Sequence, residues 1–395
     1  MAKAVPLRGV QPALLKWARE SVHLSVDEVA GRLNRAVEEV DAWESGAESP
    51  SYAQLEKLAY DLYKRPLAIF FLPAPPAEPK PEAEFRALPL ADLRRLKRDT
   101  ILLIRRARAY QESLVELFNG QSPVDEPIWK QVSLDARKSI TEQADAIRAA
   151  LRVPAPGAHE WGASDGDEAL KRWRKAVESS GVFVFKDSFK QREISGFCLD
   201  HDQFPIIMIN NGTTKTRQIF SLMHELSHIL LGWRAISTFD GNSVNMLPDR
   251  EKRIEVFCNK IAAEILVPSA DFSEQLERVP VNIELAGPEL FASLAERYRV
   301  SREVILRRFR DANRVSQEFY EERKRDWDGQ RIQRASSGGS FYLTKGAYLS
   351  EKLMNEVFSR YGRRQITIDE AADFIGVKPK QVEELESRFL RGLAA

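Results

Sequence analysis

The chain has 395 residues, of which 43% are hydrophobic and 30% are charged, with a formal net charge of +1. This length exceeds the usual size of a single core, so we expect two or three domains, and the composition excludes a largely disordered chain. No apolar run approaches the roughly 18 residues of a membrane span, and the two cysteines, Cys198 and Cys258, together with the absence of a secretory leader after Met1, predict a cytoplasmic protein without disulfides.

Shifts in composition divide the chain into segments. The stretch "PAPPAEPKPEAE" is rich in proline, which lacks the backbone N–H and disrupts helices, so it predicts a linker. Two further breaks, "VPAPGAHEWGASDGD" and "SSGGS", contain glycine, proline and serine. The predicted segments are a helical unit at 1–72, a linker at 73–84, a basic helical segment at 85–152, a mixed helix and strand region at 168–275, and helical regions at 276–335 and 341–395.

The first unit shows the pattern of short helices joined by tight turns. "LSVDEVAGRLN" opens with Ser25, and Glu28 follows three residues later, which predicts a capping box. "AVEEVDAWESG" then predicts a second helix that ends at Gly46. Two short helices joined by a tight turn form a helix-turn-helix, and residues 10–70 resemble the XRE family of repressor-type DNA-binding domains.

The charges of this unit do not match its predicted shape. In such domains the second helix enters the major groove of DNA, yet here it carries Glu38, Glu39 and Asp41. Acidic residues slightly outnumber basic ones over 1–72, so the electrostatic attraction to phosphates is missing. Two interpretations stay open, a DNA-binding domain and a helical module for protein contacts. The residues that would favour DNA binding are Lys16, Arg19, Arg32 and Arg35.

The densest basic stretch follows the linker, in "ADLRRLKRDTILLIRRARAYQESLVELF", a predicted helix that ends at Asn119 and Gly120. Its basic side chains form either a solvated helix face or a surface that binds nucleic-acid phosphates. In the second case the contact residues would be Arg94, Arg95, Lys97, Arg98, Arg105 and Arg106.

The residue pattern changes from helical to strand-like after residue 170. "GVFVFK", "ISGFCLD" and "FPIIMIN" are short β-branched and aromatic runs that predict three strands of a small sheet. The helix "FSLMHELSHILLGW" follows directly, and in it His224 and His228 lie one turn apart on the same face. Glu225 follows His224, at the position of a base that would act on a metal-activated water.

Two histidines on a mostly apolar helix have a simpler explanation, as core residues with satisfied hydrogen bonds. Burial of two histidines and a glutamate is costly, however, unless they coordinate or hydrogen-bond something, so we favour a metal site. A catalytic zinc usually has three protein ligands. The next predicted helix, "DREKRIEVFCNKIAAEILVP", offers Glu251, Glu255 and Glu264, and Glu255 is favoured because it shares one face with Asn259.

The stretches "RQIFSLMHELSHILLG" and "EVFCNKIAAEILVP" resemble the ImmA/IrrE family of bacterial metallopeptidases, some of which carry an XRE-like domain at the N-terminus. The resemblance extends over residues 10–320. It implies a zincin-like domain at 168–275, metal ligands at His224, His228 and Glu255, and Glu225 as the general base. The chain departs from the family pattern at Phe257, at Cys258 and at Ser227, where the family has Glu, Ala and Gly.

The resemblance also implies a function. The chain is expected to be a zinc-dependent, site-specific endopeptidase that cleaves a helix-turn-helix repressor and thereby induces stress-response or mobile-element genes. Mn²⁺ or iron would also suit such a ligand set. An additional oxyanion donor is needed, for which His201, Arg217 and Tyr298 are candidates. A substrate segment is expected to pair along the predicted strand "FPIIMIN".

Two later stretches repeat the helix-turn-helix rhythm, "LAERYRVSREVI" and "AADFIGVKPKQV". The first is rich in arginine, and Arg302 is a further candidate for contact with nucleic acid. The predicted fold is therefore α+β and mostly α. The alternatives are a DNA-binding transcription regulator whose metal domain is structural or sensory, and a peptidase that nucleic acid activates.

Overall fold

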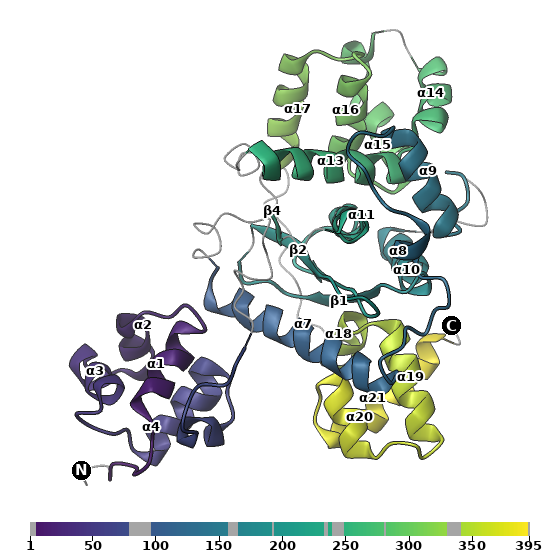
Figure 1. Ribbon diagram of the computed structural model, residues 1–395. Helices are drawn as coiled ribbons and strands as arrows, with labels where there is room; N and C mark the ends of the chain where they lie inside the picture. Colours follow the sequence, from purple (N-terminus) through teal and green to yellow (C-terminus); the bar gives the residue numbers. More distant parts are fainter. Residues whose placement is uncertain are drawn as a thin grey trace. The chain divides into compact units, whose positions relative to one another are not determined.

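The computed structural model describes residues 5–78, 96–156, 165–191, 193–232, 236–238, 249–279, 282–329 and 341–393. The chain forms two compact units, Met1–Arg106 and Ala107–Ala395, which meet within the long helix α7 (Arg98–Leu117). The fold is α+β and mostly helical, as the sequence predicts (Figure 1). None of the described helices is both long and apolar enough to cross a membrane. The finer segment boundaries stay predictions.

The N-terminal unit is a bundle of short helices. They are α1 (Pro12–Glu20), α2 (Val26–Leu33), α3 (Val37–Ser45) and α4 (Tyr52–Glu56), followed by a π-helix (Lys57–Tyr63) and a 3-10 helix (Leu67–Phe71). The predicted capping box is confirmed, because the Ser25 hydroxyl accepts from the Glu28 N–H at 3.1 Å and the Glu28 carboxylate accepts from the Ser25 N–H at 2.8 Å. Gly46 ends α3 with a φ of +83°, also as predicted. The core contains Leu14, Leu15, Ala18, Val29, Val40, Trp43, Leu55 and Phe70.

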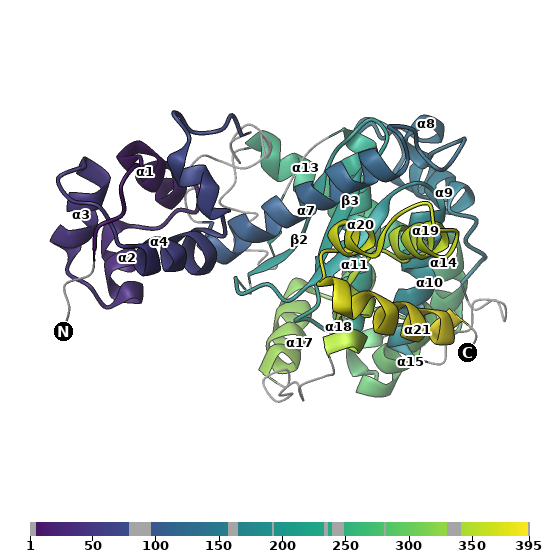
Figure 2. The ribbon, with the colours of Figure 1, turned by 90° about the horizontal axis from the view of Figure 1, so that it is seen from below.

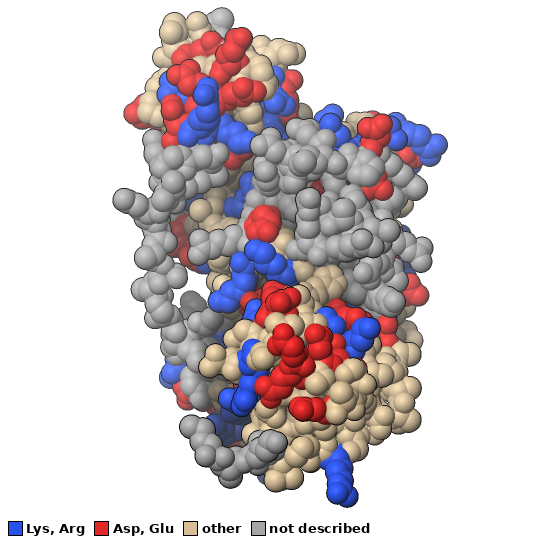
Figure 3. Space-filling view, turned by 90° about the vertical axis from the view of Figure 1, so that its left-hand side faces the viewer, with Lys and Arg blue, Asp and Glu red and all other residues tan. Residues whose placement is uncertain are grey.

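Helices α2 and α3 are joined by a turn at Asn34, whose φ is +54°, and the helix-turn-helix assignment stays a prediction. Glu38 and Asp41 of α3 are exposed, and the helix carries no lysine or arginine. In the lower part of Figure 3, where the N-terminal unit faces the viewer, acidic side chains gather with basic ones mainly at their border. Helix α3 therefore lacks the cationic groups that contacts with DNA phosphates require.

A four-stranded sheet lies at the centre of the C-terminal unit. Its strands are β1 (Phe183–Asp187), β2 (Ile194–Leu199), β3 (Ile206–Asn210) and β4 (Ile236–Thr238), in the order β1-β3-β2-β4. The strand β1 pairs with β3 in parallel, and the other pairs are antiparallel. The first three strands are the predicted ones, while β4 was not predicted. Because β3 is bonded on both sides, the expectation that a substrate pairs along "FPIIMIN" is wrong.

Helices cover both faces of this sheet (Figures 1 and 2). On one face lie α10 (Gly166–Ser179) and α11 (Lys215–Leu231). On the other lie the C-terminal end of α7 and the helices α18 (Phe341–Tyr348) and α19 (Glu351–Gly362). Tyr110 of α7 stacks on Phe185 of β1, with ring centroids 4.5 Å apart. The remaining helices that support this layer are α8 (Ile128–Gln131), α9 (Ile140–Ala150) and α13 (Asp249–Leu266).

The last part of the unit is helical. It comprises α14 (Ser269–Glu277), a 3-10 turn (Ile283–Leu285), α15 (Pro288–Tyr298), α16 (Arg302–Asp311), α17 (Gln317–Gly329), α20 (Ile368–Ile375), a 3-10 turn (Pro379–Gln381) and α21 (Val382–Leu393). In the stretches with the predicted recurrence, α15 and α20 end, like α2, at a residue with positive φ, while a repeated helix-turn-helix stays a prediction. These residues are Arg299 (+52°) and Gly376 (+63°).

A partly buried arginine joins the C-terminal helices to the sheet layer. Arg174 of α10 donates to the carbonyl oxygens of Val184 at 3.0 Å, Ala347 at 3.1 Å and Leu349 at 2.9 Å. Lys352 of α19 donates to the carbonyl of Glu178 at 3.4 Å. The segment after residue 340 is therefore attached to the sheet layer through polar contacts as well as through apolar packing.

Candidate metal centre

Helix α11 presents both histidines of the "HELSH" stretch to the interior of the C-terminal unit. The helix begins at Thr214, whose hydroxyl accepts from the Arg217 N–H, and ends at Gly232 with a φ of +72°. Its apolar positions, including Leu222 and Leu226, are fully buried. His224 and His228 are 4% and 0% exposed, so the core fixes their positions.

The third residue comes from α13, which packs against α11. Oε2 of Glu255 lies 3.2 Å from Nε2 of His224, and Oε1 lies 3.1 Å from Nε2 of His228. The two Nε2 atoms are 3.0 Å apart. Of the three carboxylates that the sequence offers, the structure therefore brings Glu255 to the histidines. Glu264 instead accepts from Arg308 at 2.9 Å and from the hydroxyl of Ser269 at 2.8 Å.

The donor set fits a divalent metal ion. One possible ligand atom from each of the three residues lies within 4.8 Å of the others, and two imidazole nitrogens with one carboxylate match the usual protein ligands of zinc in peptidases. Burial opposes ionisation of Glu255, but the imidazoles of His228 and His224 lower its pKa well below the ordinary value. The carboxylate is therefore held in its charged, metal-binding form.

Glu225 lies beside this centre, fully buried on α11. The strand β2 passes very close to it at Gly196, where a Cβ atom would come within 3.3 Å of Oε1 of Glu225 and 2.9 Å of the Met208 carbonyl oxygen. Sequence reasoning missed Gly196. The available signal was a single glycine inside a predicted strand, which often marks a close approach of other atoms to the backbone.

Cys258 lies on the other side of the centre. Its Sγ atom is 3.7 Å from Nδ1 of His228, and its side chain is fully buried. This is one of the positions at which the chain departs from the ImmA/IrrE pattern. The departure places a thiol against the ring nitrogen of His228 that faces away from Glu255.

The residues predicted to contact nucleic acid have different surroundings. Arg94 and Arg95 lie outside the described ranges, Lys97 directly precedes α7, and Arg106 lies in the middle of this helix. Arg98 donates to the Leu62 carbonyl at 2.6 Å. Arg105 donates to the carbonyls of Tyr63 at 3.2 Å and Ser21 at 2.8 Å, and burial lowers its pKa to about 10. These two guanidinium groups serve contacts within the N-terminal unit, and contact with nucleic acid stays a prediction.

The suggested oxyanion donors have other surroundings. Nδ1 of His201 accepts from the N–H groups of Gln203 at 3.0 Å and Phe204 at 3.2 Å, in the connection between β2 and β3. Tyr298 donates to Asp271, and burial together with this contact raises the pKa of Tyr298. Arg217 lies in the first turn of α11, two turns before His224. The oxyanion donor therefore stays a prediction.

Two helices supply His, His and Glu donors, with a glutamate next to the first histidine, and this cluster could hold a metal ion in the manner of an HExxH site. Residues 177–310 match the family model Peptidase M78, described as IrrE N-terminal-like domain. This range contains His224, Glu225, His228 and Glu255, so the region has a metallopeptidase-type fold and the peptidase part of the resemblance is supported. The N-terminal unit lies outside the match. A search of curated proteins finds no match.

Proposed function

We propose that the chain is a zinc-dependent, site-specific endopeptidase. The observation that carries this proposal is the convergence of His224, His228 and Glu255, with Glu225 buried beside them. Nε2 of each histidine and the Glu255 carboxylate would hold the ion. When bound, zinc supplies a Lewis acid that polarises the peptide carbonyl and makes water more acidic.

The residues of the chain supply the remaining steps. The Glu225 carboxylate accepts a proton from the attacking water and then delivers it to the nitrogen of the leaving amine. Glu225 is fully buried beside the proposed ligands, so its carboxylate is held within the site. His224 and His228 hold their ring orientation through the packing of α11.

We infer a helix-turn-helix repressor as the substrate, with induction of stress-response or mobile-element genes as the result. Support comes from the match to the IrrE N-terminal-like domain and from the resemblance of residues 10–70 to repressor-type domains. A substrate strand would pair at β4, because among the described strands β4 and β1 are the edges and α18 and α19 contact β1.

Metal content and cleavage test the proposal together. The wild-type chain should contain about one zinc per molecule, as structural and catalytic sites of this kind do, and His224→Ala and Glu255→Ala should lose it. Glu225→Gln should keep the metal and lose cleavage of purified helix-turn-helix repressors, measured by mass spectrometry of new N-termini. A wild type without metal after zinc is supplied, or undiminished cleavage by Glu225→Gln, would overturn the assignment. A chain that binds metal, cleaves no repressor and shifts operator DNA would support the regulator alternative.

A further inference from the structure

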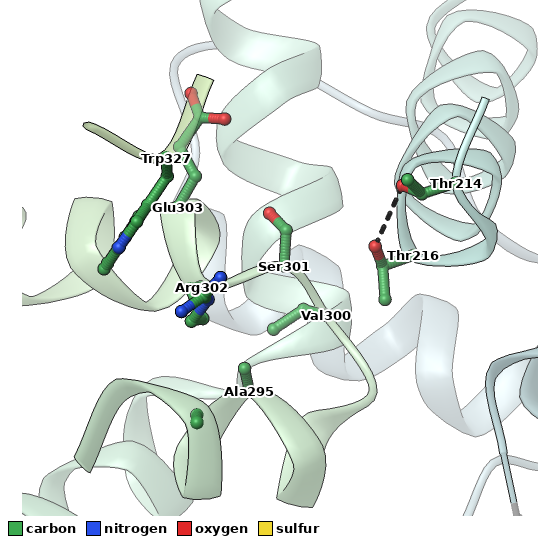
Figure 4. Close-up of a pocket in the computed structure, with 9 residues that line it drawn as sticks. Thr214, Thr216, Ala295, Val300, Ser301, Arg302, Glu303 and Trp327 are labelled. Atoms are coloured by element: carbon green, nitrogen blue, oxygen red, sulfur yellow. Dashed lines mark hydrogen bonds between the residues drawn. The ribbon is translucent and has the colours of Figure 1, made fainter. Parts of the chain in front are cut away.

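A cavity of about 370 Å³ lies among α11, α15, α16 and α17, away from the metal ligands (Figure 4). Its lining residues are Thr214, Thr216, Ala292, Ala295, Val300, Ser301, Arg302, Glu303 and Trp327. The volume falls in the range of pockets that hold small organic ligands. Thr214 and Thr216 belong to the start of α11, about 15 Å along the helix axis from His224 at 1.5 Å per residue.

The polar groups of the cavity lie on opposite walls. Figure 4 shows Arg302 beside Trp327 on one side and the hydroxyl groups of Thr214 and Thr216 on the other. These two hydroxyls are 3.3 Å apart. Between the walls, Val300 and Ala295 form an apolar floor. Hydrogen-bond donors on two walls of an apolar pocket are typical of a site that orients a small polar molecule.

Arg302 differs from the other arginines of α15 and α16. Arg297, Arg308 and Arg310 each donate to a carboxylate, and Arg307 donates to the Tyr320 hydroxyl at 3.2 Å. The guanidinium of Arg302 stacks on the Trp327 ring, 5.1 Å from its centroid, and has no acceptor among the described residues. A guanidinium that lines a cavity with its donors unused has the chemistry to receive an anion in a planar, two-point contact.

The surroundings favour a phosphate group as that anion. Besides the guanidinium, hydroxyls of Thr214, Thr216 and Ser301 line the cavity, and the first N–H groups of α11 and α16 have no carbonyl within their helices. A phosphate accepts from more donors than a carboxylate does. The negative charge of Glu303 is partly balanced by Lys324, whose Nζ lies 4.0 Å from it.

We propose that this cavity binds a small organic phosphate, of about the size of a nucleoside monophosphate, and that binding controls the metal centre. This proposed control of the metal centre by ligand binding rests on the proposed peptidase function. A ligand that contacts the start of α11 and the start of α16 together would fix the helix that carries His224, Glu225 and His228 relative to α15–α17. By linkage, ligand and zinc would then each change the affinity of the chain for the other.

The test is calorimetric titration of the full zinc-loaded chain with AMP, ribose 5-phosphate and inorganic phosphate. We expect saturable binding of AMP or ribose 5-phosphate, weakened about tenfold or more by Arg302→Gln, as loss of a charge-assisted hydrogen bond predicts. Ala292→Leu, at an exposed position that lines the cavity, should also weaken binding without changing a charge. Arg310→Gln is the matched control on the same helix and should bind as wild type does.

Each outcome of the titration either supports or overturns the proposed phosphate site. If only inorganic phosphate binds, and Arg302→Gln weakens this binding, the result would support the phosphate site and show that its ligand is the free phosphate ion. Failure of all three probes, or binding that Arg302→Gln and Ala292→Leu leave unchanged, would overturn the site. Control of the metal centre is tested by the rate of zinc loss to a chelator, which ligand should slow in wild type. If a ligand binds without changing this rate, the proposed regulation of the metal centre is overturned. If a ligand binds but the zinc-loaded chain cleaves no repressor, only the proposed function is overturned.

Discussion

The thiol of Cys258 lies 3.7 Å from Nδ1 of His228, on the side of the ring that faces away from Glu255. Histidines that bind metals generally use their second nitrogen to contact a carboxylate or a carbonyl, which fixes the ring orientation. Here α13 supplies both the carboxylate of Glu255 and, one turn later, the sulfur atom. One helix therefore contacts His228 at both of its ring nitrogens.

Removal of this sulfur should weaken metal binding. We expect Cys258→Ala to lower zinc affinity about tenfold, because changes around the ligands commonly cost 10–100-fold, while Cys258→Ser, which keeps a polar atom at the site, should recover most of the loss. Chelator competition measures the affinity. Cys198→Ala removes the other buried thiol, on β2, as a control. Equal affinities of wild type and Cys258→Ala would show that the contact does not hold the ring.

Gly196 should tolerate no side chain. A Cβ atom at this position would lie 2.9 Å from the Met208 carbonyl oxygen and 3.3 Å from Oε1 of Glu225, so either β2 or the carboxylate must move. We expect Gly196→Ala to reduce cleavage at least tenfold while zinc content is kept, and to lower the free energy of unfolding by about 1–3 kcal/mol. Gly31→Ala is a suitable control, because no atom lies within 4 Å of the added group. Wild-type turnover of Gly196→Ala would contradict the expectation.

Lys186 on β1 should make stability depend on pH. The residue is 7% exposed, and burial, with Arg174 and Lys215 nearby, lowers its pKa to about 7. Between pH 7 and the ordinary lysine pKa of about 10.4 the unfolded chain binds more protons at this position, so this lysine makes stability rise with pH over that window. Below pH 7 the folded chain must hold a buried charge.

Lys186→Met removes this charge. We expect the substitution to raise the free energy of unfolding at pH 6 by about 2 kcal/mol, with the advantage over wild type narrowing towards pH 10. Urea unfolding at a series of pH values measures both quantities. Lys190→Met, on the exposed connection after β1, controls for the general effect of losing a lysine. A difference that is constant with pH would mean that Lys186 keeps an ordinary pKa.

Removal of residues 341–395 should destabilise the sheet layer. Arg174 would lose the carbonyls of Ala347 and Leu349 and keep only that of Val184, and hydrogen bonds of a charged group contribute about 1.5–3 kcal/mol. The second change Arg174→Met, made in the shortened chain, should recover part of the lost free energy of unfolding. Urea titration of the intact chain, the shortened chain and the shortened Arg174→Met chain compares the three. No recovery would show that apolar contacts alone account for the loss.

The sequence predicts the centre of this site well because its chemistry depends on local spacing. His224, Glu225 and His228 share one helix, and their spacing alone places the histidines on one face. Glu255 is harder to predict from the sequence, because three carboxylates lie on the next helix and the choice among them depends on which face of that helix meets α11. The side-chain pattern of α13 was sufficient for that choice.

Other features depend on how distant segments meet, which a linear pattern does not contain. The basic run before residue 108 looks like a phosphate-binding stripe, yet Arg98 and Arg105 donate to carbonyls of the N-terminal unit. The order of the strands places β3 between β1 and β2, so a strand that looked available for a substrate is fully bonded. Gly196 acquires its meaning only when β2 is placed against Glu225.

The contacts of Arg174 cannot all form at the same stage of synthesis. Its two acceptors in α18 and beyond lie 173 and 175 residues later in the chain. A ribosome that adds about 5–20 residues per second reaches them roughly 10–35 seconds after it has made Arg174. During that interval the helix layer beside β1 holds a guanidinium without its full set of acceptors. We expect the helix layer beside β1 to gain its full set of contacts only after Leu349 has been made.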